Sequence, residues 1–429
     1  MPKYFGTDGI RGKSPEWLDS KKAYRIGYAI AKGLEAKKAY IGRDTRKSGI
    51  TLNQALNQGL IDGGIHPINL GIVSTPMVQY LSFKENCFGI MITASHNPYF
   101  DNGIKTIING QKSTTHEETI IESFIDNNEI NYQKLSVIQE DEKPLESYLS
   151  AIDSLKFNQS TREVFLDTAN GSLYQWAGKI LNQYTKVTGS IGNEPDGINI
   201  NRNVGSTALD CLIKEKPEGT IGLAFDGDGD RLIAIDEVGN VVSGDQILAI
   251  INHALHLDSS MVFTKMVNPG IKEVLEKNGI KVLETAIGDK YVIEKINSEK
   301  ISIGGEDSGH MIFKSFWPIG DGIISALLLL KALDEKNTSL NDAAKPFRKY
   351  PETLMNIRNI SKESFNTNHI LQKELSNLTS NLNSNTKVVI RPSGTEPVIR
   401  LYISHKDEQA LKELSQSFLT IFKKHGGVL

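Results

Sequence analysis

The chain has 429 residues, and single hydrophobic cores rarely grow beyond about 250–300 residues, so we expect two to four domains. Charged residues make up 23% of the chain and the formal net charge is −3, which gives no reason to expect nucleic acid or an anionic membrane as a partner. Cys87 and Cys211 are the only cysteines, too few for a disulfide framework. The first residues lack the basic and apolar stretches of a signal peptide, and the longest apolar run, Ile323–Leu330, is too short to span a bilayer. We therefore expect a cytoplasmic protein.

The first region alternates strand and helix patterns. Within residues 38–71 the sequence predicts a strand, a helix that ends at a pair of glycines, and a second strand. The next helix begins at STP, where the hydroxyl of Ser74 or Thr75 can cap it and the proline can occupy its first turn. A third strand, 87–93, leads directly into a polar loop that begins at Ser95.

Further along the chain, strands again lead into polar loops. A predicted strand at 220–225 precedes DGDGDR, and a strand at 260–265 comes before the loop GGEDSGH. An Asn- and Ser-rich segment, 356–385, precedes the last strands and helix. Strands that alternate with helices are typical of parallel sheets with crossover helices. We predict an α/β protein of four domains, with the boundaries 1–143, 144–244, 245–355 and 356–429.

The most informative motif is DGDGDR. In an extended backbone, residues two apart face the same side, so Asp226, Asp228 and Asp230 are predicted to converge. Crowded carboxylates repel one another unless a cation neutralises them, and hard oxygen ligands suit Mg²⁺ or Ca²⁺. A calcium EF-hand is the main alternative, because Glu237 falls on its twelfth position, but Arg231 stands where that loop needs glycine and the flanks predict strands. An acidic turn without metal is the other alternative.

Two further loops combine residue types that bind sugar phosphates. RPSGTEP begins at Arg391 after a predicted strand, and its Arg, hydroxyls and Gly can cradle a phosphate; a turn with a surface Arg is the alternative. In GGEDSGH, Glu306 and Ser308 can bind sugar hydroxyls and His310 can move a proton, unless the loop is a simple turn with a solvated His.

The remaining candidates are weaker by themselves. Ser95 and His96 are adjacent in the loop of ASHNPYFDNGIK. They could form a nucleophile with its base, or they could belong to a polar turn. GTDGIRG places Arg11 in a Gly-rich peptide that could also be a frayed terminus. His253 and His256 have no Cys or acid at ligand spacing, so we interpret them as structural or exposed.

The ordered set of a serine loop, a tri-aspartate loop, a sugar-type loop and a phosphate cradle resembles the α-D-phosphohexomutase family over the whole chain. GTDGIRG, GRDTRKSG, STPMVQYL and ASHNPYFDNGIK are most similar to its bacterial phosphoglucosamine mutase branch. The resemblance implies the four-domain phosphohexomutase architecture, with three similar βαβ-type mixed-sheet domains and a C-terminal α+β domain around a central cleft.

The resemblance also implies an isomerase activity. The expected reaction interconverts glucosamine 6-phosphate and glucosamine 1-phosphate through a phosphoserine enzyme and a 1,6-bisphosphate, on the route to UDP-N-acetylglucosamine and peptidoglycan. The implied cofactors are one Mg²⁺ per active site and a hexose bisphosphate activator, and the implied partner is a small sugar phosphate, with the chain a monomer or homodimer. A phosphomannomutase/phosphoglucomutase on the same scaffold, a non-catalytic sugar-phosphate-binding protein and a Mg²⁺ phosphatase are the alternatives.

The family's roles carry over to individual residues. Ser95 is implied as the phosphorylated residue, and its phosphate would bind Mg²⁺ together with Asp226, Asp228 and Asp230. The other implied catalytic residues are Arg11, Lys105, Arg231 and His310. The implied substrate-binding residues are His96, Glu306, Ser308, Arg391, Ser393, Gly394, Thr395 and Arg400.

Two positions depart from the family pattern. Asp307 stands where Gln is common, and Lys290 stands where Arg is usual, so that the charge is kept without the bidentate phosphate geometry. These departures leave the identity of the sugar open.

Overall fold

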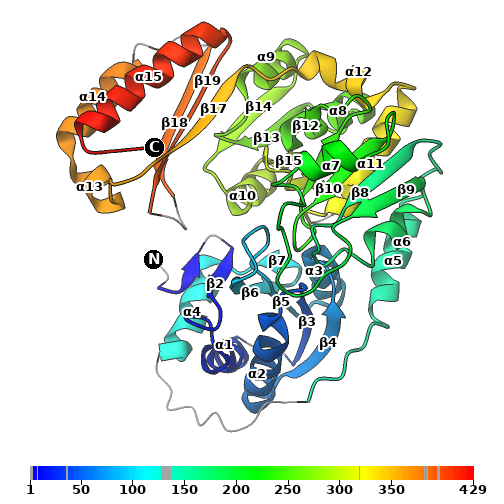
Figure 1. Cartoon of the computed structure of the whole chain (residues 1–429). Helices are drawn as coiled ribbons and strands as arrows, with labels where there is room; N and C mark the ends of the chain where they lie inside the picture. The colour runs from blue at the N-terminus through cyan, green and yellow to red at the C-terminus, as the bar shows by residue number, and fades with distance from the viewer. Residues whose placement is uncertain are drawn as a thin grey trace.

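The computed structural model describes residues 3–6, 8–34, 37–126, 137–317, 319–380, 382, 385–393 and 397–429. These residues form four sheets, each with its own helices, that follow one another along an arc (Figure 1). The N-terminal unit (blue) and the C-terminal unit (red) form the two ends of that arc. None of the described helices is long and apolar enough to cross a membrane.

The N-terminal sheet is mixed and has the strand order β1-β2-β6-β5-β3-β4, with β7 paired to β6. Its strands are β1 (Phe5–Gly6), β2 (Gly9–Lys13), β3 (Lys38–Arg43), β4 (His66–Ile72), β5 (Phe88–Ile92), β6 (Asp101–Ile108) and β7 (Gln111–Lys112). Alternate residues of β3 and β5 pack on opposite faces, because successive side chains of a strand point to opposite sides. One face carries α1 (Ser20–Gly33), α2 (Ser48–Gly63) and α4 (Thr115–Asp126), and the other carries α3 (Thr75–Glu85) and α5 (Leu145–Ser154).

The second and third sheets are also mixed. The second has the order β12-β11-β10-β8-β9 and consists of β8 (Glu163–Asp167), β9 (Lys186–Ile191), β10 (Ile221–Phe225), β11 (Leu232–Ile235) and β12 (Val241–Val242). The third has the order β14-β13-β15-β16 and consists of β13 (Ser260–Thr264), β14 (Lys281–Thr285), β15 (Ile303–Gly305) and β16 (Met311–Phe313). Their helices are α6 (Ala177–Leu181), α7 (Asp210–Glu215), α8 (Gly244–Leu255), α9 (Pro269–Lys277), α10 (Asp289–Glu299), α11 (Gly322–Glu335) and α12 (Leu340–Ala344).

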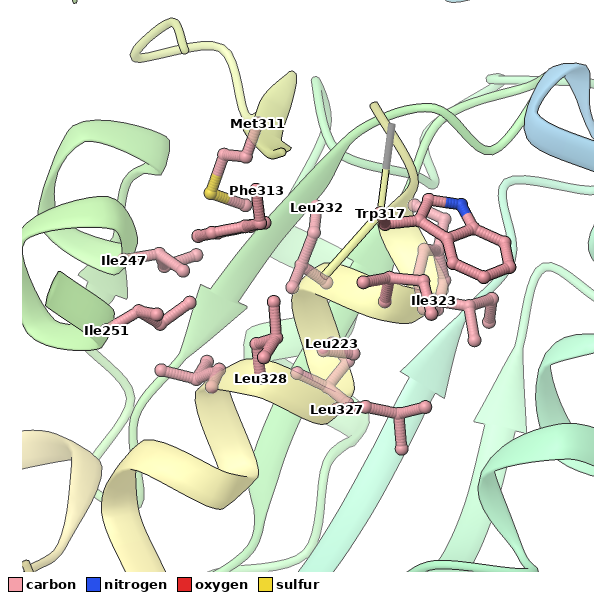
Figure 2. Close-up of a cluster of buried hydrophobic side chains, with 14 of the residues drawn as sticks. Leu223, Leu232, Ile247, Ile251, Met311, Phe313, Trp317, Ile323, Leu327 and Leu328 are labelled. Carbon is pink, nitrogen blue, oxygen red and sulfur yellow. The ribbon is translucent and has the colours of Figure 1, made fainter. Parts of the chain in front are cut away.

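The largest core joins these two sheets. Helix α11, which contains the apolar run noted above, is buried on nearly every side. Figure 2 shows Ile323, Leu327 and Leu328 of this helix beside Leu223 and Leu232 of the second sheet. A helix that is apolar all round is stable only when it is enclosed in this way. The shared core holds the second and third sheets in a fixed relation, which matters because the site draws residues from both.

The C-terminal sheet is antiparallel, in the order β17-β19-β18. It consists of β17 (Glu352–Ile357), β18 (Thr386–Pro392) and β19 (Ile399–His405), covered by α13 (Lys362–Thr367), α14 (His369–Ser380) and α15 (Glu408–Lys424). The Asn- and Ser-rich composition did not reveal α13 and α14, which bury Phe365, Leu371 and Leu375. The predicted fold class, three mixed-sheet units and a C-terminal α+β unit, is confirmed, and the domain boundaries stay a prediction.

Candidate active site

Ser95 lies in the loop that follows β5, and both its backbone and its side chain are hydrogen-bonded. It is 1% exposed, and its φ of +51° is uncommon for a residue with a side chain. The backbone N–H of Ser95 donates to Thr93 Oγ1 over 2.9 Å, and its hydroxyl donates to Asp226 Oδ2 over 2.7 Å. The structure thus brings the predicted serine loop and metal loop into direct contact, although 131 residues separate the two side chains in the sequence.

Arg46 organises this loop. Its side chain is buried, pairs with the Asp44 carboxylate over 2.9 Å, and donates to main-chain carbonyls of the serine loop. The acceptors are the carbonyl oxygens of Ser95 (2.9 Å), Asn97 (2.8 Å), Asp101 (2.9 Å) and Pro98. Sequence reasoning noted the GRDTRKSG motif but assigned Arg46 no role, because a planar guanidinium that binds several carbonyls leaves no local pattern.

The metal loop connects β10 and β11, which are antiparallel. The three carboxylates do converge, with ligand atoms within 4.8 Å of one another, but the expected extended backbone is wrong. The chain turns at Gly229, whose φ is +75°, and Asp226 Oδ1 accepts the N–H groups of Gly229 (3.1 Å) and Arg231 (3.3 Å). The EF-hand alternative is excluded because strands flank the loop and Glu237 accepts the N–H groups at the start of α12.

The triad fits a divalent cation. Burial and the neighbouring Asp230 and Asp228 raise the pKa of Asp226 well above its usual range. One carboxylate oxygen each of Asp228 and Asp230 is buried without a hydrogen-bond partner among the residues that the structure describes. Buried acceptors without a donor are costly, and hard oxygen atoms at this spacing suit Mg²⁺ or Ca²⁺. The triad is the only group of this kind in the described part of the chain.

Lys105, on β6, lies against the triad. Its Nζ is 2.7 Å from Asp228, 3.3 Å from Asp230 and 2.9 Å from Asp8. Burial lowers the pKa of Lys105, but these three carboxylates raise it by more, so that it lies well above the usual value. Lys105 is therefore a cation in this arrangement, and an ammonium group cannot accept a proton as a base.

His96 does not support the hypothesis of a Ser–His pair. Its Nδ1 is 3.3 Å from Ser95 Oγ, but that hydroxyl is closer to Asp226. Burial and the cations Arg231 and Arg11 lower the pKa of His96 to about 3. A neutral imidazole with so low a pKa is a weak base at neutral pH.

A cavity of about 460 Å³ brings together predicted residues from the strands and loops of all four sheets. The predicted residues that line it are Arg11, His96, Arg231, Glu306, Ser308, His310, Arg391, Ser393 and Arg400. Ser95 and Lys105 are buried beside it, linked to its lining through Asp8, Asp230 and His96. Gly394 and Thr395 lie outside the described residues, so their predicted role stays a prediction.

The C-terminal wall of the cavity carries two arginines side by side. Arg391 on β18 stands directly opposite Arg400 on β19. Burial and the neighbouring Arg400 lower the pKa of Arg391. Like charges directly opposite one another destabilise a strand pair, so an anion between them would be stabilising.

Asp8, Lys112 and Asp289 also line the cavity, and sequence reasoning did not single them out. Asp8 lies within the GTDGIRG motif, where a role was assigned only to Arg11. The two family departures lie elsewhere: Lys290 Nζ is 3.0 Å from Thr115 Oγ1 and does not line the cavity. Asp307 does line it, and pairs with Lys349 over 3.0 Å.

Comparisons with known proteins agree with this geometry. Models of phosphoglucomutase/phosphomannomutase α/β/α domain I, α/β/α domain III and C-terminal domain match residues 2–131, 243–350 and 342–421. The chain is 37% identical to the phosphoglucosamine mutase of Bacillus subtilis (strain 168), with 100% of both chains covered. The chain belongs to the phosphoglucomutase/phosphomannomutase family. It is also 38% identical to the phosphoglucosamine mutase of Geobacillus kaustophilus, again with 100% of both covered.

Solved structures of this family share the fold. A phosphoglucomutase/phosphomannomutase family protein from Burkholderia thailandensis superposes with a TM-score of 0.80 at 21% identity, covering 99% of this chain and 98% of its own. The N-acetylphosphoglucosamine mutase of Aspergillus fumigatus, solved with GlcNAc-6P and magnesium, gives 0.70 at 15% identity, covering 98% and 95%. The predicted membership of the phosphohexomutases is confirmed.

Proposed function

We propose that the chain is an isomerase that interconverts glucosamine 6-phosphate and glucosamine 1-phosphate, on the route to UDP-N-acetylglucosamine. The full-length relatives named phosphoglucosamine mutase support the sugar. The observation that carries the chemistry is the contact of Ser95 Oγ with Asp226, inside a carboxylate triad beside a cavity that ends in two arginines. Such a site has a nucleophile at one end and an anion clamp at the other.

The arginine pair is the proposed clamp for the phosphate that does not react. Arg391 and Arg400 supply two guanidinium groups, and Ser393 supplies a hydroxyl, on one wall of the cavity. Glu306 and Ser308 would hold sugar hydroxyls between this clamp and the serine loop. A substrate with a phosphate at each end can then bind in either orientation, which a 1,6-bisphosphate intermediate requires.

In the first half-reaction, phosphorylated Ser95 gives its phosphoryl group to a sugar hydroxyl. The Oγ–P bond breaks and a bond from phosphorus to the sugar oxygen forms, while the hydroxyl proton goes to a base and Ser95 Oγ gains a proton. His310, which lines the cavity, is the proposed base, and the cationic Lys105 is the proposed acid. After the bisphosphate turns round, the second half-reaction runs these steps in reverse with the other phosphate.

Charge neutralisation is the main catalytic requirement, because the reaction offers the protein little covalent chemistry. Asp226, Asp228 and Asp230 would hold one Mg²⁺ together with the phosphate of Ser95, and the bound ion would act as a Lewis acid. Arg11 and Arg231, which line the cavity next to His96, would stabilise charge on the phosphoryl oxygens.

The decisive experiment compares kcat/KM for the 6-phosphates of glucosamine, glucose and mannose, with glucosamine 1,6-bisphosphate as activator. We expect a clear preference for glucosamine 6-phosphate; a preference for glucose or mannose would identify a phosphoglucomutase or phosphomannomutase. Intact mass after incubation with the bisphosphate should show one phosphate that is lost in Ser95→Ala. A chain without phosphate would be a binding protein, and release of inorganic phosphate faster than isomerisation would identify a phosphatase.

A further inference from the structure

Lys112 connects two parts of the site that belong to different sheets. It lies on β7 of the N-terminal unit, lines the cavity, and is 16% exposed. Its Nζ is 2.5 Å from Asp8 Oδ1 and also forms an ion pair with Asp289 Oδ2 at the start of α10 in the third unit. One ammonium group therefore joins carboxylates from two units at the floor of the cavity.

The two carboxylates each hold a residue of the proposed machinery. Asp8 Oδ2 pairs with Lys105 Nζ over 2.9 Å and also with Arg11. Asp289 Oδ2 lies 3.6 Å from His310 Nε2. Lys105, Asp8, Lys112, Asp289 and His310 thus form one continuous chain of groups, in which each carboxylate lies between two basic residues.

Without the positive charge of Lys112, the carboxylates of Asp8 and Asp289 would repel each other. Burial and Asp8 raise the pKa of Asp289, whereas Lys112 lowers it. Burial also raises the pKa of Asp8, whereas Lys105, Lys112 and Arg11 lower it, so Lys112 acts on both carboxylates. Burial lowers the pKa of Lys112, but Asp289 and Asp8 raise it by more, so the ammonium form is favoured. Without that ammonium, the like charges at the floor of the cavity would push β2 and α10 apart.

Lys290 offers a matched comparison one residue beyond Asp289. It also links the third unit to the N-terminal unit, through Thr115 Oγ1 at 3.0 Å and Glu118 at 4.0 Å. Unlike that of Lys112, its side chain lies outside the cavity lining and pairs with neither Asp8 nor Asp289, although its backbone N–H donates to Asp289 Oδ1 over 2.8 Å. A comparison of variants of the two lysines can therefore distinguish contacts that only dock the two units from contacts inside the site.

We propose that Lys112 is a positioning residue, which sets Lys105 and Arg11 of the N-terminal unit in register with His310 of the third unit by bridging Asp8 and Asp289. The inference rests on the proposed function for the identity of the reacting groups. Proton transfer and in-line attack depend steeply on distance, and a displacement of about 1 Å can lower the rate about 10²-fold. Lys112 contacts neither Ser95 nor the aspartate triad, so it acts through the groups it holds.

The test compares Lys112→Met, Lys112→Arg and Lys290→Met with the wild type in the full-length enzyme. We measure isomerisation kinetics, the melting temperature, and hydrogen exchange of the β2 amides beside Asp8. Lys112→Met should lose about 10²-fold in kcat with a smaller change in KM, and its β2 amides should exchange faster. Lys112→Arg, which keeps the bridge, should recover most of kcat, and Lys290→Met should stay within about threefold of the wild type because it lies outside the cavity.

Three results would overturn the inference. Lys112→Met could match Lys290→Met in both kcat and β2 exchange, which would reduce Lys112 to docking of the units. Lys112→Arg could be folded yet as inactive as Lys112→Met, which would assign the lysine a chemical step. If Lys112→Met fails to fold, Asp289→Asn breaks the bridge from the other side, and unchanged kcat and β2 exchange in that variant would also refute the proposal. A wild type without isomerase activity would refute the proposed function instead, and β2 exchange would then decide the inference alone.

Discussion

The two ends of the active-site cavity are built on opposite principles. At the serine end, nearly every charge is buried and opposed by a protein group, as with Arg46 and Asp44 or Lys105 and Asp228. At the C-terminal end, Arg391 and Arg400 face each other across a strand pair. The first end is held by ion pairs and hydrogen bonds within the protein, whereas the second brings two cations together on one wall of the cavity.

This difference matches the demands of a phosphoryl transfer with a reorienting intermediate. The nucleophile and the metal loop must hold their geometry through both half-reactions, and buried hydrogen bonds supply that rigidity. The clamp must release one phosphate and then bind another, so its contacts with phosphate must form and break in each catalytic cycle. The comparison predicts that equivalent changes at the two ends have different consequences.

The largest contrast should come from the two serines. Ser95→Ala should lower kcat by about 10⁴-fold or more, because it removes the group that carries the phosphoryl. Ser393→Ala, on the clamp wall, should mainly raise KM. Steady-state isomerisation assays measure both, and the melting temperature should change little for Ser95→Ala. Near-normal turnover of Ser95→Ala would show that another residue is the nucleophile.

The arginines should differ in their effect on stability. Arg46→Met leaves the buried Asp44 carboxylate without its cation and several loop carbonyls without a donor, so we expect the free energy of unfolding to fall by about 3–5 kcal/mol. Arg400→Gln removes one guanidinium group from the cavity wall and leaves the contacts of Arg46 intact, so KM should increase while the free energy of unfolding falls by less than in Arg46→Met. Urea unfolding measures both variants. Equal destabilisation would contradict the proposed division between a rigid end and a clamp.

The metal loop should lose its ion when one carboxylate is neutralised. Asp228→Asn should weaken Mg²⁺ binding by at least about 10²-fold, because it removes one charge from the triad, as calorimetric titration would show. Asp236→Asn is the matched control: it neutralises another buried carboxylate, which caps the turn after β11, and should leave Mg²⁺ affinity unchanged. A chelator should abolish turnover and Mg²⁺ should restore it. Mg²⁺ affinity that is equal in the two variants would exclude the triad as the site.

The last prediction concerns acid stability at the buried end. The pKa of His96 is lowered to about 3 in the folded chain, so between about pH 6.5 and pH 3 the unfolded state binds a proton that the folded state does not. Stability is therefore fully present above pH 6.5 and falls as the pH decreases, by about 2 kcal/mol at pH 5. His96→Asn should remove this part of the loss between pH 8 and pH 5 in urea titrations. The same loss in both proteins would show that His96 is protonated in the folded state.

Much of the fold followed from local patterns. The apolar run 87–93 was predicted as a strand and contains β5. Gly64, the second of the two predicted glycines, ends α2 with a φ of +99°. Helices α13 and α14 were not predicted, because an Asn- and Ser-rich stretch has low intrinsic helix propensity and these helices depend on burying a few apolar residues against β19.

The chain by itself determined which chemistries are available: a serine after a buried strand, three aspartates around glycines, and an arginine at a Pro-Ser-Gly turn are local properties of residue type and spacing. The tertiary structure decided which of these groups meet. Arg46, Lys112 and Asp289 act through partners from distant segments, and no local pattern specifies which carbonyl or carboxylate a long cationic side chain will reach. Burial decided the rest, because the charge states of His96 and Lys105 depend on the desolvation and the neighbouring charges that only the packed chain creates.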